Sequence, residues 1–234
     1  MILPGVVKTN FVSFFDFFLP RFCVSCPTKL NPSEDSFCVN CLNKIEIASA
    51  ERINHEFERK FKNDKIISDF FSLFVFEKDR ELQHGIHALK YNNRFKVGIF
   101  LGVLLGRKVR ELNQIWKIDF VIPIPLHHLK KAERGYNQSY YIAKGVNLIL
   151  NCKLKDNAVK RVKYTESQTT MNLSERKENI AEAFKVRRRK TLQGKNILLI
   201  DDVITTGATI TECGNILLES GANKIYAASV AIAD

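Results

Sequence analysis

Hydrophobic positions along the chain change their spacing several times, and each change indicates a different kind of element. Apolar runs bounded by turn residues predict strands, and apolar residues three or four positions apart predict helices. The predicted strands cover 71–76, 119–125, 158–163, 196–201 and 224–232. The predicted helices cover 80–112, 139–150 with Ser139 as N-cap, and 208–222, which Gly221 ends.

The order of these elements predicts the fold class. Strands that alternate with helices favour a parallel sheet with crossover helices, which is an α/β fold. In such sheets ligands bind beyond the carboxyl ends of the strands. Residues 197–209 read ILLIDDVITTGAT, so two adjacent aspartates follow the most apolar strand. We therefore expect a ligand site at the end of this strand.

Asp201 and Asp202 carry like charges whose burial is costly without a partner. Residues 205–209, TTGAT, form a turn that opens into the helix predicted from 208. A helix N-terminus favours a phosphate, and Gly207 permits close approach of the backbone while the threonines offer hydroxyl donors. Carboxylates suit hydroxyl groups, so the stretch indicates a sugar phosphate such as ribose 5-phosphate. The alternative is an acidic helix-capping box, which explains one Asp or one Thr but not the whole run.

Four of the six cysteines form two Cys-x-x-Cys pairs, Cys23 with Cys26 and Cys38 with Cys41, separated by 11 residues. Two such turns supply the four thiolates of a tetrahedral site suited to a structural Zn²⁺. A redox role needs only one pair, and disulfides need an oxidising compartment. We therefore expect zinc to supply folding energy to the polar segment between the pairs. Cys152 and Cys213 stand in apolar patterns typical of small core residues.

The composition is ordinary for a globular protein, with 45% hydrophobic and 26% charged residues in 234. The net charge of +11 is compatible with anionic partners, and residues 153–195 hold 13 basic and 5 acidic residues. RRRK (187–190) is the densest part of this block and would be the densest part of a surface that binds DNA. Such a block is equally well a solvated face. No apolar run reaches the ~18 residues of a membrane span. The aromatic stretch 10–22 lacks a signal-peptide layout and is expected to dock on the core, which predicts a cytoplasmic protein.

The stretch 197–209 resembles the 5-phosphoribosyl-1-pyrophosphate (PRPP) signature of type I phosphoribosyltransferases: an aliphatic strand, two acids, two aliphatics and Thr-Thr-Gly-Ala-Thr. The resemblance implies that Asp201 and Asp202 hold the ribose 2′- and 3′-hydroxyls, with Mg²⁺ adjacent. It implies that a second set of residues wraps the 5′-phosphate: Thr205, Thr206, Gly207, Ala208 and Thr209.

Further motifs narrow the resemblance. FLPRFCVSC, CVNC, ALKY (88–91), PIPLHHLKKAERGYNQS (123–139) and QTTMNLSERKENIAEAF (168–184) occur in the order of the ComF family, which includes proteins of natural competence. That family joins an N-terminal zinc-binding segment, here expected within 1–50, to a phosphoribosyltransferase-like domain, here 67–234. The boundary between the two domains is expected in the polar stretch 44–66. Met171 and Glu182 depart from its usual leucine and glycine. Neither change obviously touches the ligand.

ERGYNQ (133–138) lies between a predicted strand and a helix, where a phosphoribosyltransferase places its pyrophosphate loop. Arg134 offers a positively charged fork and Gly135 a tight turn; the alternative is a surface pair of Arg134 with Glu133. The nearby His127, His128, Lys130 and Lys131 suggest a general positive field.

Residues 163–176 are polar and without periodicity. They correspond in this fold to a loop that closes over the reacting centre, with Gln168 and Arg176 as catalytic candidates. Lys90 and Tyr91 either border the site or are ordinary helix-terminal residues.

Three function classes follow. The first is an enzyme that transfers a phosphoribosyl group from PRPP to an unidentified acceptor and releases pyrophosphate, with catalysis resting on Arg134, Mg²⁺ and backbone N–H groups. The second is a PRPP sensor without turnover. The third is a competence factor, linked to DNA uptake or to other competence proteins, that holds single-stranded DNA. Such binding usually requires aromatic platforms, and within 153–195 only Tyr164 and Phe184 supply them.

Overall fold

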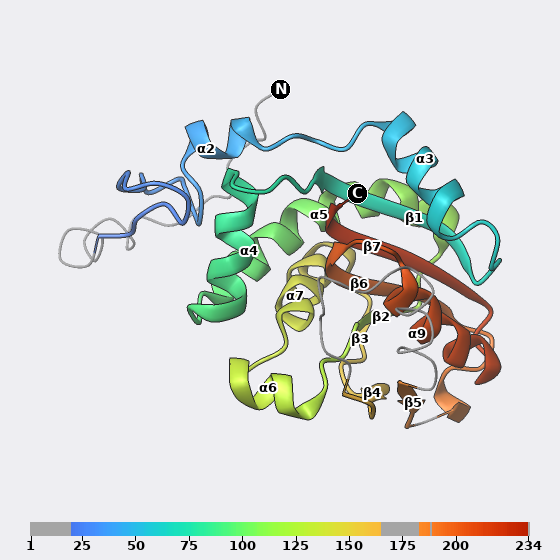
Figure 1. Ribbon diagram of the computed structural model, residues 1–234. Coiled ribbons are helices and arrows are strands. Elements are labelled where there is room, and N and C mark those ends of the chain that lie inside the picture. The colour runs from blue at the N-terminus through green and yellow to red at the C-terminus, as the bar shows by residue number, and fades with distance from the viewer. Residues whose placement is uncertain (1–19, 165–182, 188, 234) are drawn as a thin grey trace.

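The centre of the structure is a sheet whose strands all run parallel (Figure 1). The structure is a computed structural model that describes residues 20–164, 183–187 and 189–233. Within these ranges five strands form the sheet in the order β1-β7-β6-β2-β3. Their bounds are β1 Ile67–Val75, β7 Lys224–Ile232, β6 Asn196–Ile204, β2 Phe120–Pro123 and β3 Lys153–Leu154. The predicted α/β fold with a parallel sheet is confirmed.

Helices cover both faces of the sheet. Side chains of β6 alternate between two hydrophobic cores, with Leu198 and Ile200 in one and Ile197 and Leu199 in the other. The first core lies under α4 (Glu81–Tyr91), α5 (Phe95–Trp116) and α7 (Gln138–Leu150). The second lies under α3 (Ala50–Lys60) and α9 (Ala208–Glu219), which occupy the other side (Figure 1). Burial on both faces explains why the strands are almost continuously apolar.

The strand predicted over 196–201 is longer than expected. β6 continues to Ile204 because β7 stays paired with it as far as Ile232. On its other side β6 pairs with β2 only as far as Ile200, opposite Pro123. Asp201 and Asp202 therefore lie inside β6 rather than at its end, at the level where the neighbouring strand has stopped.

The single helix predicted over 80–112 is two helices. The break falls at 92–94, where Asn93 adopts a left-handed conformation with φ 53° that no helix continues through. α5 then extends beyond the predicted end to Trp116, whose Nε1 donates to Asp69 Oδ2 at 2.9 Å. This bond joins the end of α5 to β1.

Two further expectations concern helix ends. Ser139 is not the N-cap of α7: the side chain of Asn137 accepts the N–H of Ser139 at 3.1 Å, and the helix starts at Gln138. The end of α9 follows the expectation, because Gly221 has φ 93° and donates its N–H to the carbonyl of Leu218 at 2.8 Å. The N–H of Ala222 reaches the carbonyl of Leu217 at 3.1 Å, which completes a Schellman cap.

The strand predicted over 158–163 lies outside the parallel sheet. It forms β4 (Val159–Arg161), which pairs antiparallel with β5 (Phe184–Val186). Several short elements were not predicted because they span too few residues to show a period: β3, β5, α2 (Val39–Lys44), α6 (His128–Arg134) and a 3₁₀ turn (Arg189–Thr191).

Residues 44–66, the expected domain boundary, pack against the sheet. The Glu46 carbonyl accepts the N–H of Val75 at 3.0 Å, and the N–H of Ala48 reaches the Leu73 carbonyl at 3.1 Å. α3 follows, beginning after Ser49, whose hydroxyl accepts the N–H of Arg52. No helix within the described ranges is long and apolar enough to cross a membrane. Of the stretch 10–22, residues 10–19 lie outside the described residues.

Candidate functional site

The loop 124–137, which follows β2, lies beside the aspartate pair of β6. After β2 ends, the N–H of Ile124 still bonds the carbonyl of Ile200 at 2.9 Å. The carbonyl of Ile124 in turn accepts from Asn137 Nδ2 at 2.9 Å. These bonds hold the start and the end of the loop 124–137 beside Ile200, one residue before Asp201. The geometry therefore joins the two segments that the sequence singled out separately.

Asp201 is half-buried and held by two donors. Its Oδ1 accepts from the hydroxyl of Ser139 and from the N–H of Asp202, each at 2.9 Å. Burial, together with the charge of Asp202, raises the pKa of Asp201 to about 7. Ser139 was expected only as a cap; its sequence signal was a polar residue at the start of an otherwise apolar helix.

Asp202 is 5% exposed and forms an ion pair with Lys90 at the end of α4, with 2.5 Å between Nζ and Oδ2. Burial opposes ionisation of Asp202, but the Lys90 ammonium outweighs it and holds the pKa of Asp202 below its usual value. Burial likewise acts against the charge of Lys90, and the two aspartates overcome it, so the pKa of Lys90 is raised. The adjacent carboxyls thus differ: one is committed to an ion pair, and the other titrates near neutrality.

The turn after β6 leaves the start of α9 open. Gly207 is the N-cap residue, with φ 79°, and it has no side chain to cap the helix. Thr206 Oγ1 accepts the N–H of Ala208 at 3.4 Å, Thr205 is exposed and Thr209 is half-buried. A helix start of this kind presents N–H groups and a partial positive charge to an anion.

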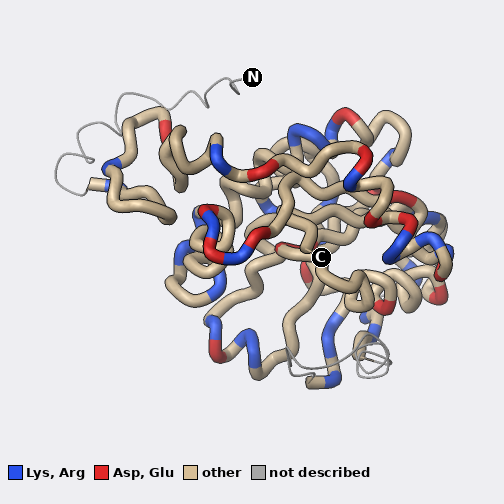
Figure 2. The backbone as a smooth tube through the Cα atoms, turned by 45° about the horizontal axis from the view of Figure 1, so that its top comes forward, with Lys and Arg blue, Asp and Glu red and all other residues tan. Residues whose placement is uncertain are grey.

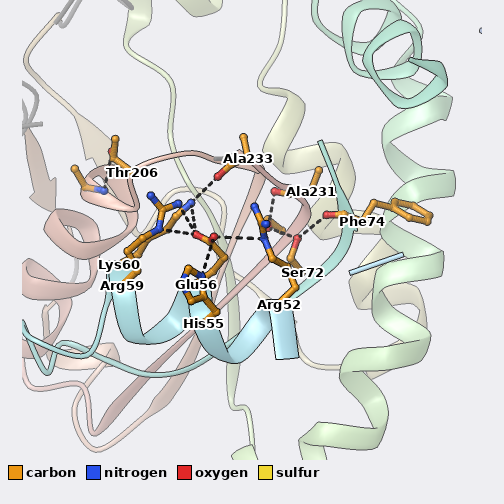
Figure 3. Close-up of polar contacts among 12 residues, drawn as sticks. Arg52, His55, Glu56, Arg59, Lys60, Ser72, Phe74, Thr206, Ala231 and Ala233 are labelled. Carbon is orange, nitrogen blue, oxygen red and sulfur yellow. Dashed lines mark hydrogen bonds and ion pairs between the residues drawn. The ribbon is translucent and has the colours of Figure 1, made fainter. Parts of the chain in front are cut away.

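The C-terminal end of α3 packs against this turn, and its charged side chains meet around Glu56 (Figure 3). A Cβ placed on Gly207 would lie 2.7 Å from Cε1 of Phe61, the C-cap residue of α3. The preceding Lys60 donates to the carbonyl of Ala233 at 2.7 Å and pairs at 3.0 Å with Glu56, which is 1% exposed. Burial opposes ionisation of Glu56, and the cations of Arg59 and Lys60 hold its pKa below the usual value. Sequence reasoning missed this support because residues 44–66 were expected to hold only a boundary.

Arg134 is the last residue of α6 and faces α4. Its guanidinium donates to Gln138 Oε1 at 3.2 Å and to the Tyr91 hydroxyl at 3.4 Å, and its Cζ lies 5.2 Å from the Tyr91 ring centre. Arg134 thus contacts Gln138 and Tyr91, and not Glu133, the surface partner that the alternative interpretation expected. Gly135 follows with φ 78°, which ends the helix and turns the chain.

The residues around α6 divide by exposure. His127 is buried, caps α6 by accepting the N–H of Leu129 at 3.4 Å, and has its pKa lowered by burial. It therefore adds no dependable positive charge, contrary to the expectation. His128 and Lys131 are exposed, and Lys130 Nζ lies 5.6 Å from the ring centre of Tyr164. Gln168 and Arg176 lie outside the described residues, with most of 163–176.

The four cysteines of the two pairs come together. Their sulfur atoms all lie within 4.8 Å of one another, and Cys26 Sγ is 3.7 Å from Cys38 Sγ. A tetrahedral site with Zn–S bonds of about 2.3 Å places its sulfurs about 3.8 Å apart. Cys23 Sγ also accepts the N–H groups of Ser25 at 3.4 Å and Cys38 at 3.3 Å. The cluster could hold a metal ion, and the donor set and spacing fit Zn²⁺.

The thiols differ in environment. The side-chain hydrogen bond with Thr28 lowers the pKa of Cys26 to about 6, whereas burial raises the pKa of Cys38 and Cys41. A bound divalent cation would favour the thiolate in all four. Cys213 is fully buried in the second core, as expected, and Cys152 is half-buried with its thiol 3.4 Å from the Ile118 carbonyl.

Several known proteins are similar to this chain in sequence. A family model described as phosphoribosyl transferase domain matches residues 136–233. The chain is 33% identical over 206 residues to competence protein ComFC of Bacillus subtilis, a match that covers 86% of this chain and 79% of that protein. It is 32% identical over 144 residues to competence protein F of Haemophilus influenzae, covering 60% of this chain and 63% of that protein.

Solved structures give a weaker likeness. Purine phosphoribosyltransferase from Pyrococcus horikoshii has a TM-score of 0.36 and 20% identity, covering 58% of this chain and 73% of that one. Glutamine PRPP amidotransferase from B. subtilis has a TM-score of 0.41 and 16% identity, covering 62% of this chain and 30% of that one. At such scores these structures carry no argument of their own.

The fold assignment instead combines the matched family model with the observed sheet of parallel strands flanked by helices. The N-terminal cysteine cluster and the match to ComFC along most of the chain extend the likeness beyond that domain. The chain therefore belongs to the ComF family, which includes competence protein ComFC, with a domain of the type I phosphoribosyltransferase fold behind an N-terminal four-cysteine segment.

Proposed function

We propose that the chain binds PRPP at the carboxyl edge of β6 and transfers its phosphoribosyl group to an acceptor, with release of pyrophosphate. Residues 67–234 would form the transferase domain, and residues 1–50 a zinc-binding segment. The observation that carries the proposal is the Asp201–Asp202 pair, held by Ser139 and Lys90, beside the start of α9, where Gly207 offers no capping side chain. Carboxylates suited to ribose hydroxyls and a helix start suited to a phosphate would thus belong to one site.

Each group has a chemical task in this proposal. Asp202, kept ionised by Lys90, accepts from a ribose hydroxyl, and Asp201 accepts from its neighbour. The N–H groups at the start of α9 and the threonines of 205–209 bind the 5′-phosphate. Arg134 and the Gly135 turn face the pyrophosphate. Gln168 and Arg176 belong to the loop proposed to cover the reacting centre.

In the transfer step the acceptor nitrogen donates its lone pair to ribose C1. The bond from C1 to the pyrophosphate oxygen breaks, and the leaving pyrophosphate takes that electron pair while the acceptor gives up a proton to solvent. Negative charge grows on the leaving group, so Arg134 and Lys90 stabilise it. Mg²⁺, when bound with PRPP beside Asp201 and Asp202, supplies further neutralisation of that charge.

Calorimetry with PRPP and Mg²⁺, followed by a pyrophosphate-release assay against a panel of nitrogen nucleophiles, tests the proposal. Asp202→Asn should weaken binding about ten- to hundred-fold, since removing a charged acceptor costs ~1.5 to 3 kcal/mol. Equal affinity of the two proteins would remove the ribose site from β6. Binding without pyrophosphate release for any acceptor would instead favour a PRPP sensor that performs no transfer.

A second candidate function, binding of single-stranded DNA, is favoured by a basic groove. A cavity of about 810 Å³ lies between α6, the start of α7 and the β4–β5 hairpin. Its lining includes five basic side chains and three tyrosines: His128, Lys131, Lys160, Arg161, Arg187, Tyr136, Tyr140 and Tyr141. Several Lys and Arg positions gather at the lower edge of Figure 2. Basic groups beside aromatic rings suit a single strand.

The aromatic side chains of this groove differ from those the sequence suggested. Phe184 is 3% exposed and lies under Arg161, whose Cζ is 5.4 Å from the ring centre, so Phe184 offers no stacking face. Tyr164 is 43% exposed and contacts His127 edge-on. The three tyrosines instead follow Gly135 in the chain, so a bound strand would lie next to the proposed pyrophosphate site. A cytoplasmic location is also proposed, because the stretch 10–22 lacks a signal-peptide layout. Other competence proteins are proposed as partners on family likeness alone.

A further inference from the structure

The helix α4 contacts the cysteine segment with one half and the proposed PRPP site with the other. In its N-terminal half, Glu81 pairs with Lys44 at 3.7 Å, and His84 Nδ1 lies 3.2 Å from the Ser25 hydroxyl between Cys23 and Cys26. Gly85 packs directly on the ring of Phe37, the residue before Cys38. All three partners belong to the cysteine segment or to α2, which continues it (Figure 1).

The C-terminal half of α4 carries the contacts to the site. Lys90 pairs with Asp202, Tyr91 lies under the guanidinium of Arg134, and the carbonyl of Leu89 accepts the hydroxyl of Tyr136. The helix spans 11 residues, about 16 Å, so it acts as one rigid piece between the two groups of contacts. A displacement at Gly85 is therefore carried to Lys90, little more than one turn further along.

The packing of Gly85 on Phe37 is the tightest contact between α4 and the cysteine segment. The side chain of Phe37 is 2% exposed, its ring centre lies 6.2 Å from that of Phe100 in α5, and a methyl group on Gly85 would overlap the ring. The cysteine cluster holds Phe37 in place, because Phe37 precedes Cys38 and the N–H of Cys38 donates to Cys23 Sγ. The four-sulfur cluster thus fixes the position of the ring against which α4 rests.

We propose that Phe37 is a positioning residue for the PRPP site: by seating α4 at Gly85, it sets the place of Lys90 against Asp202. The inference rests on the proposed function, because the readout is PRPP binding. It gives the cysteine segment a role in the affinity of the transferase domain, in addition to its own folding.

The test perturbs the contact from both sides and measures PRPP binding by calorimetry. Gly85→Ala raises the helix propensity of α4, so an effect of this substitution arises from the collision with Phe37 and not from a weaker helix. Phe37→Leu keeps an apolar side chain but removes the ring. We expect both variants to retain the metal and their circular dichroism, and to bind PRPP roughly three- to twenty-fold more weakly, which lies within the range of couplings between neighbouring groups.

A double-mutant cycle with Lys90→Met separates positioning from general packing. If Phe37 acts through Lys90, Gly85→Ala and Phe37→Leu should weaken PRPP binding little or not at all in the Lys90→Met background. Undiminished affinity in both single variants, additive losses in the cycle, or general unfolding of the variants would each overturn the inference. Absence of PRPP binding by the wild type would instead reject the proposed function.

Discussion

The ammonium of Lys90 lies 2.5 Å from Oδ2 of Asp202, and the two residues come from α4 and β6, which are remote in the sequence. The pair keeps one of two adjacent carboxyls ionised, because the positive charge lowers the pKa of Asp202 although burial acts in the opposite direction. In the proposed site it also places a cation near Arg134, which is assigned to the pyrophosphate.

Replacing Lys90 by Met should therefore weaken PRPP binding. The variant lacks a cation and leaves Asp202 buried without its ion pair, a change that typically costs several kcal/mol in the unliganded protein. We expect PRPP affinity to fall about ten-fold or more and the midpoint of thermal unfolding to decrease. Lys96→Met, which removes an exposed lysine of α5, is the matched control for charge and should change neither value. Equal PRPP affinity in the Lys90 variant and this control would contradict the assigned role.

The stability of the unliganded protein should fall as pH rises toward neutrality because of Asp201. The pKa of Asp201 is about 7 in the folded protein against an ordinary value of 3.8, so the folded state binds this proton more tightly than the unfolded chain. The free energy of unfolding therefore decreases between about pH 4 and pH 7. The pKa of Asp202 is lowered instead of raised. Asp202 therefore changes the free energy of unfolding only below its ordinary pKa of 3.8, outside this pH range.

Asp201→Asn should remove that decrease. At pH 8 we expect its melting temperature to exceed that of the wild type by about 2 to 4 °C for each kcal/mol relieved, with no gain at pH 4. Asp156→Asn, at an exposed position, serves as the control. Thermal melts of the three proteins across this range check the prediction. A constant difference between wild type and Asp201→Asn at all pH values would show that the carboxyl does not titrate there.

The cysteine cluster should hold about one zinc ion per chain. Cys38→Ser removes one of four sulfurs that lie within 4.8 Å of one another, and we expect the metal to dissociate and residues up to about 45 to unfold. The α/β domain should stay folded, with a lower melting temperature because Cys38 and Phe37 belong to the first core. Elemental analysis, circular dichroism and thiol titration provide the measurements.

Cys152→Ser is the matched control for the cluster, because Cys152 lies outside it. This substitution should leave the metal content unchanged. Wild-type protein that contains no metal and exposes four reactive thiols would contradict the zinc assignment.

The basic groove can be tested apart from the PRPP site. Lys160 and Arg187 line the groove and are exposed, and neither contacts the aspartate pair or the 205–209 turn. If single-stranded DNA binds there, the double variant Lys160→Gln, Arg187→Gln should bind a labelled oligonucleotide several-fold more weakly. The slope of log K against log salt should become shallower by about 1.4, which is about 0.7 for each phosphate that the variant no longer neutralises.

PRPP affinity should be unchanged in that variant, and Lys78→Gln, Lys96→Gln is a control of equal charge away from the groove. The stretch RRRK (187–190) was expected to be the densest part of a DNA surface, and of its members Arg187 contributes to this cavity lining. If fluorescence anisotropy shows the same affinity for the groove variant and the control, Lys160 and Arg187 belong to a solvated face and not to a DNA site.

The sequence by itself determined the chemical features that are local in the chain. The run from Ile197 to Thr209 contains the strand, the two carboxyls and the helix start in consecutive residues, so its pattern could be interpreted without knowledge of packing. The same holds for the cysteine pairs, because the Cys-x-x-Cys spacing already predicts which sulfurs can meet. Strong apolar periods likewise predicted β6, β7, α7 and α9, and with them the parallel α/β fold.

Only the tertiary structure decided which distant side chains complete the site. Ser139 reaches Asp201 across 62 positions, and Lys90 reaches Asp202 because α4 and β6 pack into the same core. α3 behind Gly207 and Phe37 against Gly85 depend in the same way on how separate segments are brought together. A local pattern specifies the type of an element and the face that it buries. Which partner that face meets is set by the packing of the whole chain, where many weak contacts act together.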